Sequence, residues 1–331
     1  MKKVKWCVIG AAGIADKRAI PGMLLDPQNE LVAVMDRNAE KARCVAQKYQ
    51  IPAYFTDPEE MLKNTPCDAV YIATPVYCHY EHAMLALKYG VAALVEKPVT
   101  MNAAEGEKLL AAFREKGLQL SVGYMMDYHN LHRKARELVQ SGRLGKINLA
   151  RLQFSYWYPD MPNAWRQKKA LSGGGCIMDL AVHCMALFAF VTGEEIVEVK
   201  SFYSTRTFSY EVEDGAVITF RSESGILGHI DVNFNLPIQL AVSKLELYGT
   251  EGCLRAEKTQ SQLEQGKMQY WHRDADGSQT RKTYYARGGN MYTRQFRAFN
   301  RLLQGKPDYA NMERAIRIQK LCDTIYQKKP D

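Results

Sequence analysis

The stretch VKWCVIGAAGIA, residues 4–15, decides the fold of this chain. The apolar run Val4–Ile9 is typical of a strand buried in a parallel sheet, and it runs into a turn of small residues. That turn follows the pattern G-x-G-x-x-G loosely, because Ala12 and Ala15 occupy the second and third glycine positions. Three lysines near the start also resemble a secretion signal, but the alternation of the later segments favours the strand.

The first 123 residues alternate between short apolar runs and segments with helical spacing. The expected strands after the first are Leu31–Met35, Ala69–Ala73, Ala92–Val95 and Leu118–Val122. The expected helices are Ala39–Tyr49, a helix opened by Asp57 and Pro58, His79–Tyr89 and Ala103–Lys116. This alternation predicts an α/β fold with a doubly wound parallel sheet, and we place the first domain at residues 1–123.

The remainder, residues 124–331, is richer in long runs with strand alternation. The expected strands are Asn148–Tyr158, Val197–Ser204, Ala216–Phe220, Ile226–Phe234 and Lys244–Tyr248. The expected helices are His132–Ser141, Ile177–Val191, Tyr292–Leu303 and Glu313–Gln327. Helices segregated from a run of strands predict an α+β domain with a largely antiparallel sheet.

Composition narrows the classes of function. The 331 residues carry 44 basic and 36 acidic side chains, and the densest basic cluster is only Arg166, Lys168 and Lys169, so we expect no nucleic-acid partner. The longest apolar stretch, Ala181–Val191, is far shorter than the ~20 residues of a membrane span. The eight cysteines form no C-x-x-C pair, which favours a reducing compartment and a cytoplasmic location.

A dinucleotide site is predicted from two features together. Gly10, Ala12, Gly13, Ile14 and Ala15 form the turn at which phosphates would meet a helix N-terminus. Such turns also occur without a nucleotide, but the second strand ends at Asp36, where an acid would bind ribose hydroxyls and repel a 2′-phosphate. Arg37 follows it and could stack on adenine, pair a 2′-phosphate or be an exposed loop residue. We expect NAD as the cofactor and leave NADP open.

The fifth strand of the first domain delivers Val95-Glu96-Lys97-Pro98. Lysine is rarely buried without a task, and ligands sit at the carboxyl edge of a doubly wound sheet. A structural salt bridge of Glu96 or Lys97 is the competing interpretation. The position favours a functional lysine.

A third motif is Gly173-Gly-Gly-Cys-Ile-Met-Asp179-Leu-Ala-Val-His183. Asp179 and His183 are four residues apart on one face of the predicted helix, and a histidine beside a carboxylate is a candidate general acid–base. A zinc site with Cys176 and Cys184 would need more ligands at metal-binding spacing, so we expect no metal. A buried structural histidine remains open.

These motifs, in this order, resemble the Gfo/Idh/MocA family of pyridine-nucleotide oxidoreductases over essentially the whole chain. The signature elements are GAAGIA at 10–15, Glu96-Lys97-Pro98 and GGGxxxDxxxH at 173–183. Further matches are Ala73-Thr74-Pro75 with His79, Val122-Gly123-Tyr124, Trp165-Arg166 and Gly249–Gly252.

The resemblance implies an N-terminal Rossmann domain with Thr74, Pro75, His79 and Glu96 near the cofactor. It implies a C-terminal domain, 124–331, whose open sheet lines the substrate pocket and mediates oligomerisation, as a homodimer or homotetramer. Lys97 would hydrogen-bond the reacting hydroxyl, His183 would relay its proton, and Asp179 would hold sugar or cyclitol hydroxyls beside Tyr124. Trp165 and Arg166 would reach back to the cofactor.

We therefore expect an oxidoreductase that moves a hydride between NAD and a ring hydroxyl or ketone of a sugar, sugar derivative or inositol. One alternative retains NAD for transient oxidation during glycoside cleavage or elimination, and another is a non-catalytic nucleotide sensor. The joint presence of Lys97, Asp179 and His183 argues against a sensor. Val76 departs from the family pattern at a contact on the nicotinamide side, and Asp127 and Asn130 depart from it at the local wall of the substrate pocket.

Overall fold

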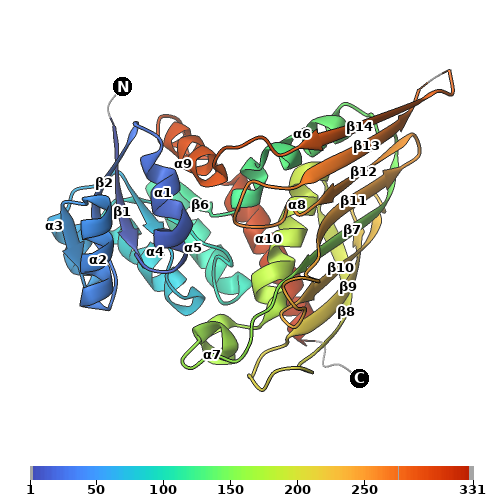
Figure 1. Cartoon of the computed structure of the whole chain (residues 1–331). Coiled ribbons are helices and arrows are strands. Elements are labelled where there is room, and N and C mark those ends of the chain that lie inside the picture. The colour runs from blue at the N-terminus through green and yellow to red at the C-terminus, as the bar shows by residue number, and fades with distance from the viewer. Residues whose placement is uncertain (1–2, 275, 328–331) are drawn as a thin grey trace. The chain divides into compact units, whose positions relative to one another are not determined.

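The computed structural model describes residues 3–274 and 276–327, and these form two compact units (Figure 1). The first contains the described residues up to Gly123 together with Tyr292–Arg317. The second contains Tyr124–Met291 together with the described residues from Ile318 onward. The ends of the two domains expected from the sequence, residues 1–2 and 328–331, lie outside the described residues.

The first unit is built on a six-stranded parallel sheet in the order β3-β2-β1-β4-β5-β6. Its strands are β1 (Val4–Ile9), β2 (Asn29–Met35), β3 (Ala53–Phe55), β4 (Ala69–Ile72), β5 (Ala92–Val95) and β6 (Leu120–Val122). The helices between them are η1 (Ala15–Ala19, a π-helical turn), α1 (Ile20–Leu24), α2 (Ala39–Tyr49), α3 (Pro58–Asn64), α4 (His79–Lys88) and α5 (Ala103–Lys116). The order reverses between β1 and β4, which is where open α/β sheets bind ligands.

Local capping explains why the helices begin and end where the sequence predicts. Asn38, Asp57 and Asn102 each accept a hydrogen bond from a backbone N–H in the first turn of α2, α3 and α5, respectively. Gly117 ends α5 at φ 63°, in the left-handed region that glycine adopts easily. The strand β3 was not expected, because three half-buried or exposed residues give no clear periodicity.

Helix α9 (Met291–Leu302) lies almost entirely in the first unit, although the sequence placed this segment with the second domain. Its aromatic side chains explain the assignment. Phe296 and Phe299 pack on the fully buried Trp6 of β1, with ring centroids 5.1 and 5.2 Å apart. Asn300 donates to Asn29 at 2.7 Å, so the contact is both apolar and hydrogen-bonded.

The second unit contains an eight-stranded sheet in the order β14-β13-β12-β11-β7-β10-β9-β8, antiparallel except for the pair β7 and β10. Its strands are β7 (Ile147–Ser155), β8 (Ile196–Ser204), β9 (Gly215–Ser222), β10 (Leu227–Asn233), β11 (Ser243–Gly249), β12 (Gly252–Glu257), β13 (Lys267–Arg273) and β14 (Gln279–Tyr285). The longer of the remaining helices in the described residues are α6 (Asn130–Gln140), α8 (Val182–Thr192) and α10 (Ala310–Gln327), of which α10 crosses the division at residue 317. The short ones are the 3-10 turns η2 (Val76–Cys78), η3 (Met125–Tyr128) and η4 (Trp165–Gln167), the single turn α7 (Lys169–Ser172) and the π-helical turn η5 (Ile177–Ala181). The fold class predicted from the sequence is confirmed.

One face of the second sheet is covered and the other carries exposed side chains. Helix α8 contacts both β7 and α6, and Figure 1 shows α6 and α8 against the same face. On the strands the burial alternates, and Phe202 of β8 is 82% exposed. The unexpected strands β12, β13 and β14 form one end of this sheet.

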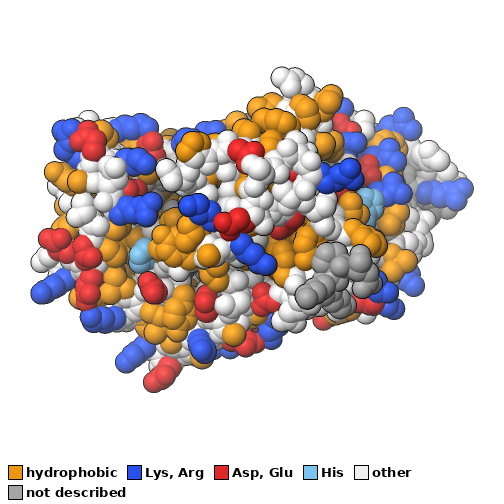
Figure 2. Space-filling view, turned by 90° about the horizontal axis from the view of Figure 1, so that it is seen from below, with side chains coloured by type: hydrophobic (Ala, Val, Ile, Leu, Met, Phe, Trp, Pro, Cys, Tyr) orange, Lys and Arg blue, Asp and Glu red, His pale blue; other side chains and the backbone are white. Residues whose placement is uncertain are grey.

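The helical stretch Lys169–Thr192 is long and apolar enough in composition to cross a membrane, although the sequence contains no uninterrupted apolar run of that length. However, 83% of its most apolar 18-residue segment is buried inside the protein, as in a core helix. On the face shown in Figure 2, basic and acidic side chains of the described residues are interspersed and form no continuous basic stripe.

Candidate functional site

The Gly-rich turn lies at the carboxyl end of β1 and fits a dinucleotide. Gly10 has φ 87°, and a Cβ there would lie 2.8 Å from the backbone of Ala73 and Thr74, so only glycine allows this approach. Both Gly10 and Ala11 donate to the Met35 carbonyl at 2.9 Å, which ties the turn to β2. Gly13 also has a positive φ, 64°, with nothing within 4 Å of its would-be Cβ. Gly13 therefore leaves open space beside the backbone of the turn that leads into η1, as phosphate binding requires.

Asp36 and Arg37 follow β2 at the same edge. The Asp36 carboxylate is half-buried and accepts hydrogen bonds from Ala12 N at 3.3 Å and Asn38 N at 3.0 Å. It thus sits beside the Gly-rich turn, as a ribose-binding acid must. Arg37 is exposed and lies near Tyr77. A hydrogen bond with Cys78 and burial raise the pKa of Tyr77, and the positive charge of Arg37 partly lowers it again.

The loops after β4 and β5 are joined by His79. Its Nε2 lies 2.9 Å from the Thr74 carbonyl, its Nδ1 lies 2.9 Å from the Pro98 carbonyl, and burial lowers its pKa to about 4. The neighbouring Thr74 hydroxyl contacts His82 at 3.1 Å. His79 therefore fixes the separation of the two segments that carry Thr74-Pro75 and Lys97-Pro98.

Glu96 and Lys97 stand at the carboxyl end of β5, beyond a strand that is buried throughout. The Glu96 carboxylate is buried; it accepts from the Tyr71 hydroxyl at 2.5 Å and from Lys97 N at 3.2 Å. A Cβ on Gly123 would lie 3.0 Å from Glu96 Oε1, so the carboxylate fills the space that this glycine leaves. The half-buried Lys97 is thus anchored through its backbone and precedes a cis peptide bond to Pro98.

In the second unit, Asp179 is the centre of a polar cluster. Tyr156 donates to Asp179 Oδ2 at 2.7 Å, and Arg166 Nε lies 3.8 Å from Oδ1. The Arg166 guanidinium also lies 4.2 Å from the Trp165 ring centroid. Burial and the Asp179 charge raise the pKa of Tyr156 well above its usual value, so Tyr156 stays a donor. The sequence places Tyr156 in the expected strand Asn148–Tyr158 and gives no signal for this contact.

His183 lies in the first turn of α8, directly after the π-helical turn η5 that carries Asp179. Its side chain is buried, and its ring meets Phe154 at 6.0 Å with an interplanar angle of 62°. Tyr124, the first residue of the second unit, is also buried. Each unit thus brings its own predicted residues together. In the first unit these are the turn Gly10–Ala15, Asp36, Thr74, Glu96 and Lys97. In the second unit they are Trp165, Arg166 and Asp179.

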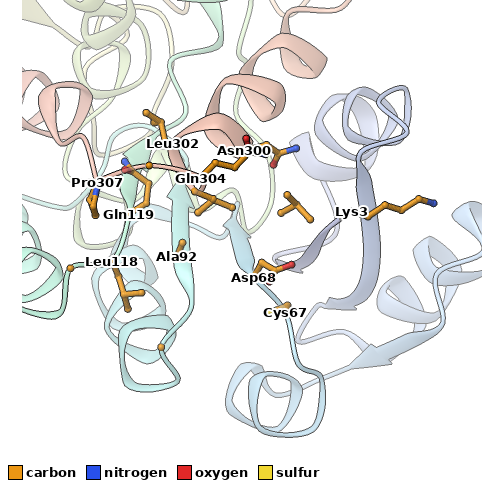
Figure 3. Close-up of a pocket in the computed structure, with 15 residues that line it drawn as sticks. Lys3, Cys67, Asp68, Ala92, Leu118, Gln119, Asn300, Leu302, Gln304 and Pro307 are labelled. Atoms are coloured by element: carbon orange, nitrogen blue, oxygen red, sulfur yellow. The ribbon is translucent and has the colours of Figure 1, made fainter. Parts of the chain in front are cut away.

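A cavity of about 540 Å³ lies at the opposite, amino edge of the first sheet (Figure 3). Cys67, Asp68, Ala92 and Gln119 point toward it, together with residues after α9. None of the predicted site residues lines this cavity.

Metal chemistry has no support among residues 3–274 and 276–327, where no group of three or more His, Cys, Asp or Glu side chains could hold an ion. All eight cysteines are free thiols, and Cys184 instead contacts Gln260 at 3.2 Å. Burial raises the pKa of both Cys176 and Cys184.

The parallel sheet with its strand-order reversal, the Gly10 turn and the adjacent Asp36 together define a dinucleotide-binding protein with a second, mostly antiparallel domain.

Comparison with known proteins gives the family. The sequence profile of the oxidoreductase family with an NAD-binding Rossmann fold matches residues 4–124, and that of the GFO/IDH/MocA C-terminal domain matches residues 132–255. The chain belongs to the Gfo/Idh/MocA family and is an NAD(P)-dependent oxidoreductase, as the sequence motifs predicted.

Among its relatives is 1,5-anhydro-D-fructose reductase of Ensifer adhaerens, 28% identical over 91% of this chain and 88% of the relative. Similar solved folds include a 3-ketoreductase of Actinomadura kijaniata in complex with NADP and TDP-benzene, with a TM-score of 0.86 and 22% identity over 98% of both chains. Another is levoglucosan dehydrogenase in complex with NADH and levoglucosan, with a TM-score of 0.87, 20% identity, and coverage of 98% of this chain and 97% of that one.

Proposed function

We propose that this chain oxidises a ring hydroxyl, or reduces a ring ketone, of a sugar, sugar derivative or cyclitol. The observation that carries the proposal is Lys97, placed at the carboxyl end of β5 by a buried Glu96 that is itself clamped by Tyr71. The Gly10 turn and Asp36 lie at that same edge of the sheet. The names of the relatives, an anhydrofructose reductase among them, support a sugar as the substrate class.

In the proposed reaction a bound nicotinamide nucleotide supplies the hydride acceptor or donor. The Lys97 ammonium has three N–H donors and no acceptor, so it would stabilise negative charge on the reacting oxygen. His183 would take the hydroxyl proton during oxidation and return it during reduction. Asp179, oriented by Tyr156 and Arg166, would accept hydrogen bonds from neighbouring substrate hydroxyls.

The cofactor residues divide into direct and indirect contributors in this proposal. The turn Gly10–Ala15, Asp36 and Arg37 would contact the nucleotide, with Asp36 favouring NAD over NADP. His79 would act indirectly, because both ring nitrogens already contact the backbone carbonyls of Thr74 and Pro98. Residues 1–123 would thus bind the cofactor and 124–331 the substrate, in a cytoplasmic homodimer or homotetramer that uses the exposed sheet face.

A substrate scan tests the proposal. The purified protein is incubated with aldoses, anhydro sugars and cyclitols plus NAD⁺ or NADP⁺, and with keto sugars plus NADH or NADPH, while the absorbance of the reduced nicotinamide is recorded. We expect stoichiometric turnover with at least one sugar or cyclitol. Nucleotide binding without any net turnover would instead favour the enzyme that retains its cofactor, or the sensor.

A further inference from the structure

Glu213 occupies a special place beside the triglycine motif. It lies two residues before β9, is 6% exposed, and belongs to the same unit as Asp179 and His183. Three consecutive backbone N–H groups donate to it: Gly175 N and Ile177 N to its carboxylate Oε1 at 2.9 and 3.0 Å, and Cys176 N to its carbonyl at 3.1 Å. Tyr326 of α10 donates to the same Oε1 at 2.7 Å.

The glycines of the motif make this approach possible. A Cβ on Gly175 would overlap the carbonyl oxygen of Glu213, and a Cβ on Gly174 would overlap the Tyr326 hydroxyl. These two glycines thus allow a buried acid and a tyrosine to hold the start of the helical segment.

We propose that Glu213 is a positioning residue: its carboxylate holds the N–H groups of Gly175 and Ile177 and thereby sets the start of the helical segment that presents Asp179 and His183. This inference rests on the proposed function, in which those two side chains serve the substrate. The coupling is direct along the chain, because Asp179 N donates to the carbonyl of Gly175 at 3.0 Å. A shift at Gly175 therefore moves Asp179 with it.

The electrostatics suit an anchor held by hydrogen bonds. The groups that donate to the Glu213 carboxylate are the N–H groups of Gly175 and Ile177 and the Tyr326 hydroxyl, and these hydrogen bonds stabilise its charge. Burial raises the pKa of Glu213, and the hydrogen bonds from Ile177, Tyr326 and Gly175 oppose that effect. The position of Oε1, which accepts these hydrogen bonds, therefore sets the geometry of the helix start more than the negative charge of the carboxylate does.

Two conservative variants separate reach from charge. Glu213→Gln keeps an oxygen at the same reach and loses the charge, whereas Glu213→Asp keeps the charge and withdraws the oxygen. We expect kcat to stay within about threefold of wild type in Glu213→Gln and to fall about 10- to 100-fold in Glu213→Asp, because small misplacements of reacting groups are costly. KM should change much less than kcat. The matched controls are Glu223→Gln and Glu223→Asp, at an exposed acid in the turn after β9, and both should behave as wild type.

Hydrogen–deuterium exchange provides a readout that does not depend on activity. The amides of residues 175–177 should exchange faster in Glu213→Asp than in wild type or Glu213→Gln. Unchanged exchange would overturn the anchor, and faster exchange with wild-type kcat would overturn the positioning role. If Glu213→Asp does not fold, Tyr326→Phe removes one bond from the same oxygen and should also raise exchange at 175–177; no change there would overturn the proposal. An inactive wild type with protected amides would count against the proposed function alone.

Discussion

At the scale of single residues, Lys97 is the side chain on which the proposed chemistry most depends. Its backbone is held by Glu96, which Tyr71 clamps from the neighbouring strand, so a change of the lysine side chain should leave that scaffold in place. Lys97→Met should lower turnover by about 10³-fold or more with cofactor affinity nearly unchanged, since it removes a contact that strengthens in the transition state. Steady-state kinetics and NADH fluorescence titration measure the two effects. Turnover near that of wild type would refute the role of Lys97.

Asp36 is the residue that we propose sets the choice between NAD and NADP. Asp36→Ser should weaken NAD binding about 10- to 100-fold, because a hydrogen bond to a charged group contributes ~1.5–3 kcal/mol, and should improve the relative binding of NADP. Dissociation constants for both nucleotides provide the measurement. Asp57→Ser is the control, because serine can still cap α3. An unchanged NAD/NADP preference would leave Asp36 as a residue that only braces the turn.

At the scale of elements, η5 and α8 carry the candidate acid–base pair. In the oxidation direction His183 must be neutral to accept a proton, so His183→Asn should cut turnover and flatten the acid limb of the pH–rate profile. Asp179→Asn should act more on KM, because its proposed task is to hold hydroxyls. Full pH profiles of both variants test this. An unaltered profile for His183→Asn, or an aggregated protein, would indicate a structural histidine packed on Phe154.

The same elements explain what could be predicted from the sequence. The starts of helices α2, α3 and α5 were located well, because Asn38, Asp57 and Asn102 are local capping signals, and Gly117 similarly marks the end of α5. The positions of the Gly-rich turn and Lys97 at the carboxyl edge of the sheet could be predicted because they follow from strand order.

The contacts that were missed join residues far apart in the sequence. Tyr156 meets Asp179 across 23 residues, and Glu213 meets Gly175 across 38. No periodicity of one segment can report such a pairing. The return of α9 onto Trp6 was missed for the same reason. Strands β12 to β14 were missed for a different reason, because polar and charged residues interrupt their apolar alternation.

At the scale of the whole molecule, each unit contains a buried neutral histidine. Burial lowers the pKa of His79 to about 4 and that of His132 to about 3, below the ~6.5 of an unfolded chain. Between these values the unfolded state binds protons that the folded state does not. The contribution of these histidines to the free energy of unfolding should therefore be fully present above about pH 6.5. It should fall on acidification by ~1.4 kcal/mol per pH unit for each histidine.

Urea unfolding at a series of pH values from about 7 to 5 measures this loss. His132→Gln should make the free energy of unfolding fall less steeply on acidification, because one of the two buried neutral histidines is then absent. A free energy of unfolding that does not change across this range would contradict the buried, neutral state of both histidines.

The central claim is direct hydride transfer between a ring carbinol and the nicotinamide. Its most direct test uses a substrate from the scan that carries deuterium on the reacting carbon, with mass spectrometry of the reduced cofactor after turnover. We predict that each NAD(P)H molecule formed carries one deuterium and that Lys97→Met forms almost none. Turnover of the labelled substrate that leaves the cofactor unlabelled would contradict the claim.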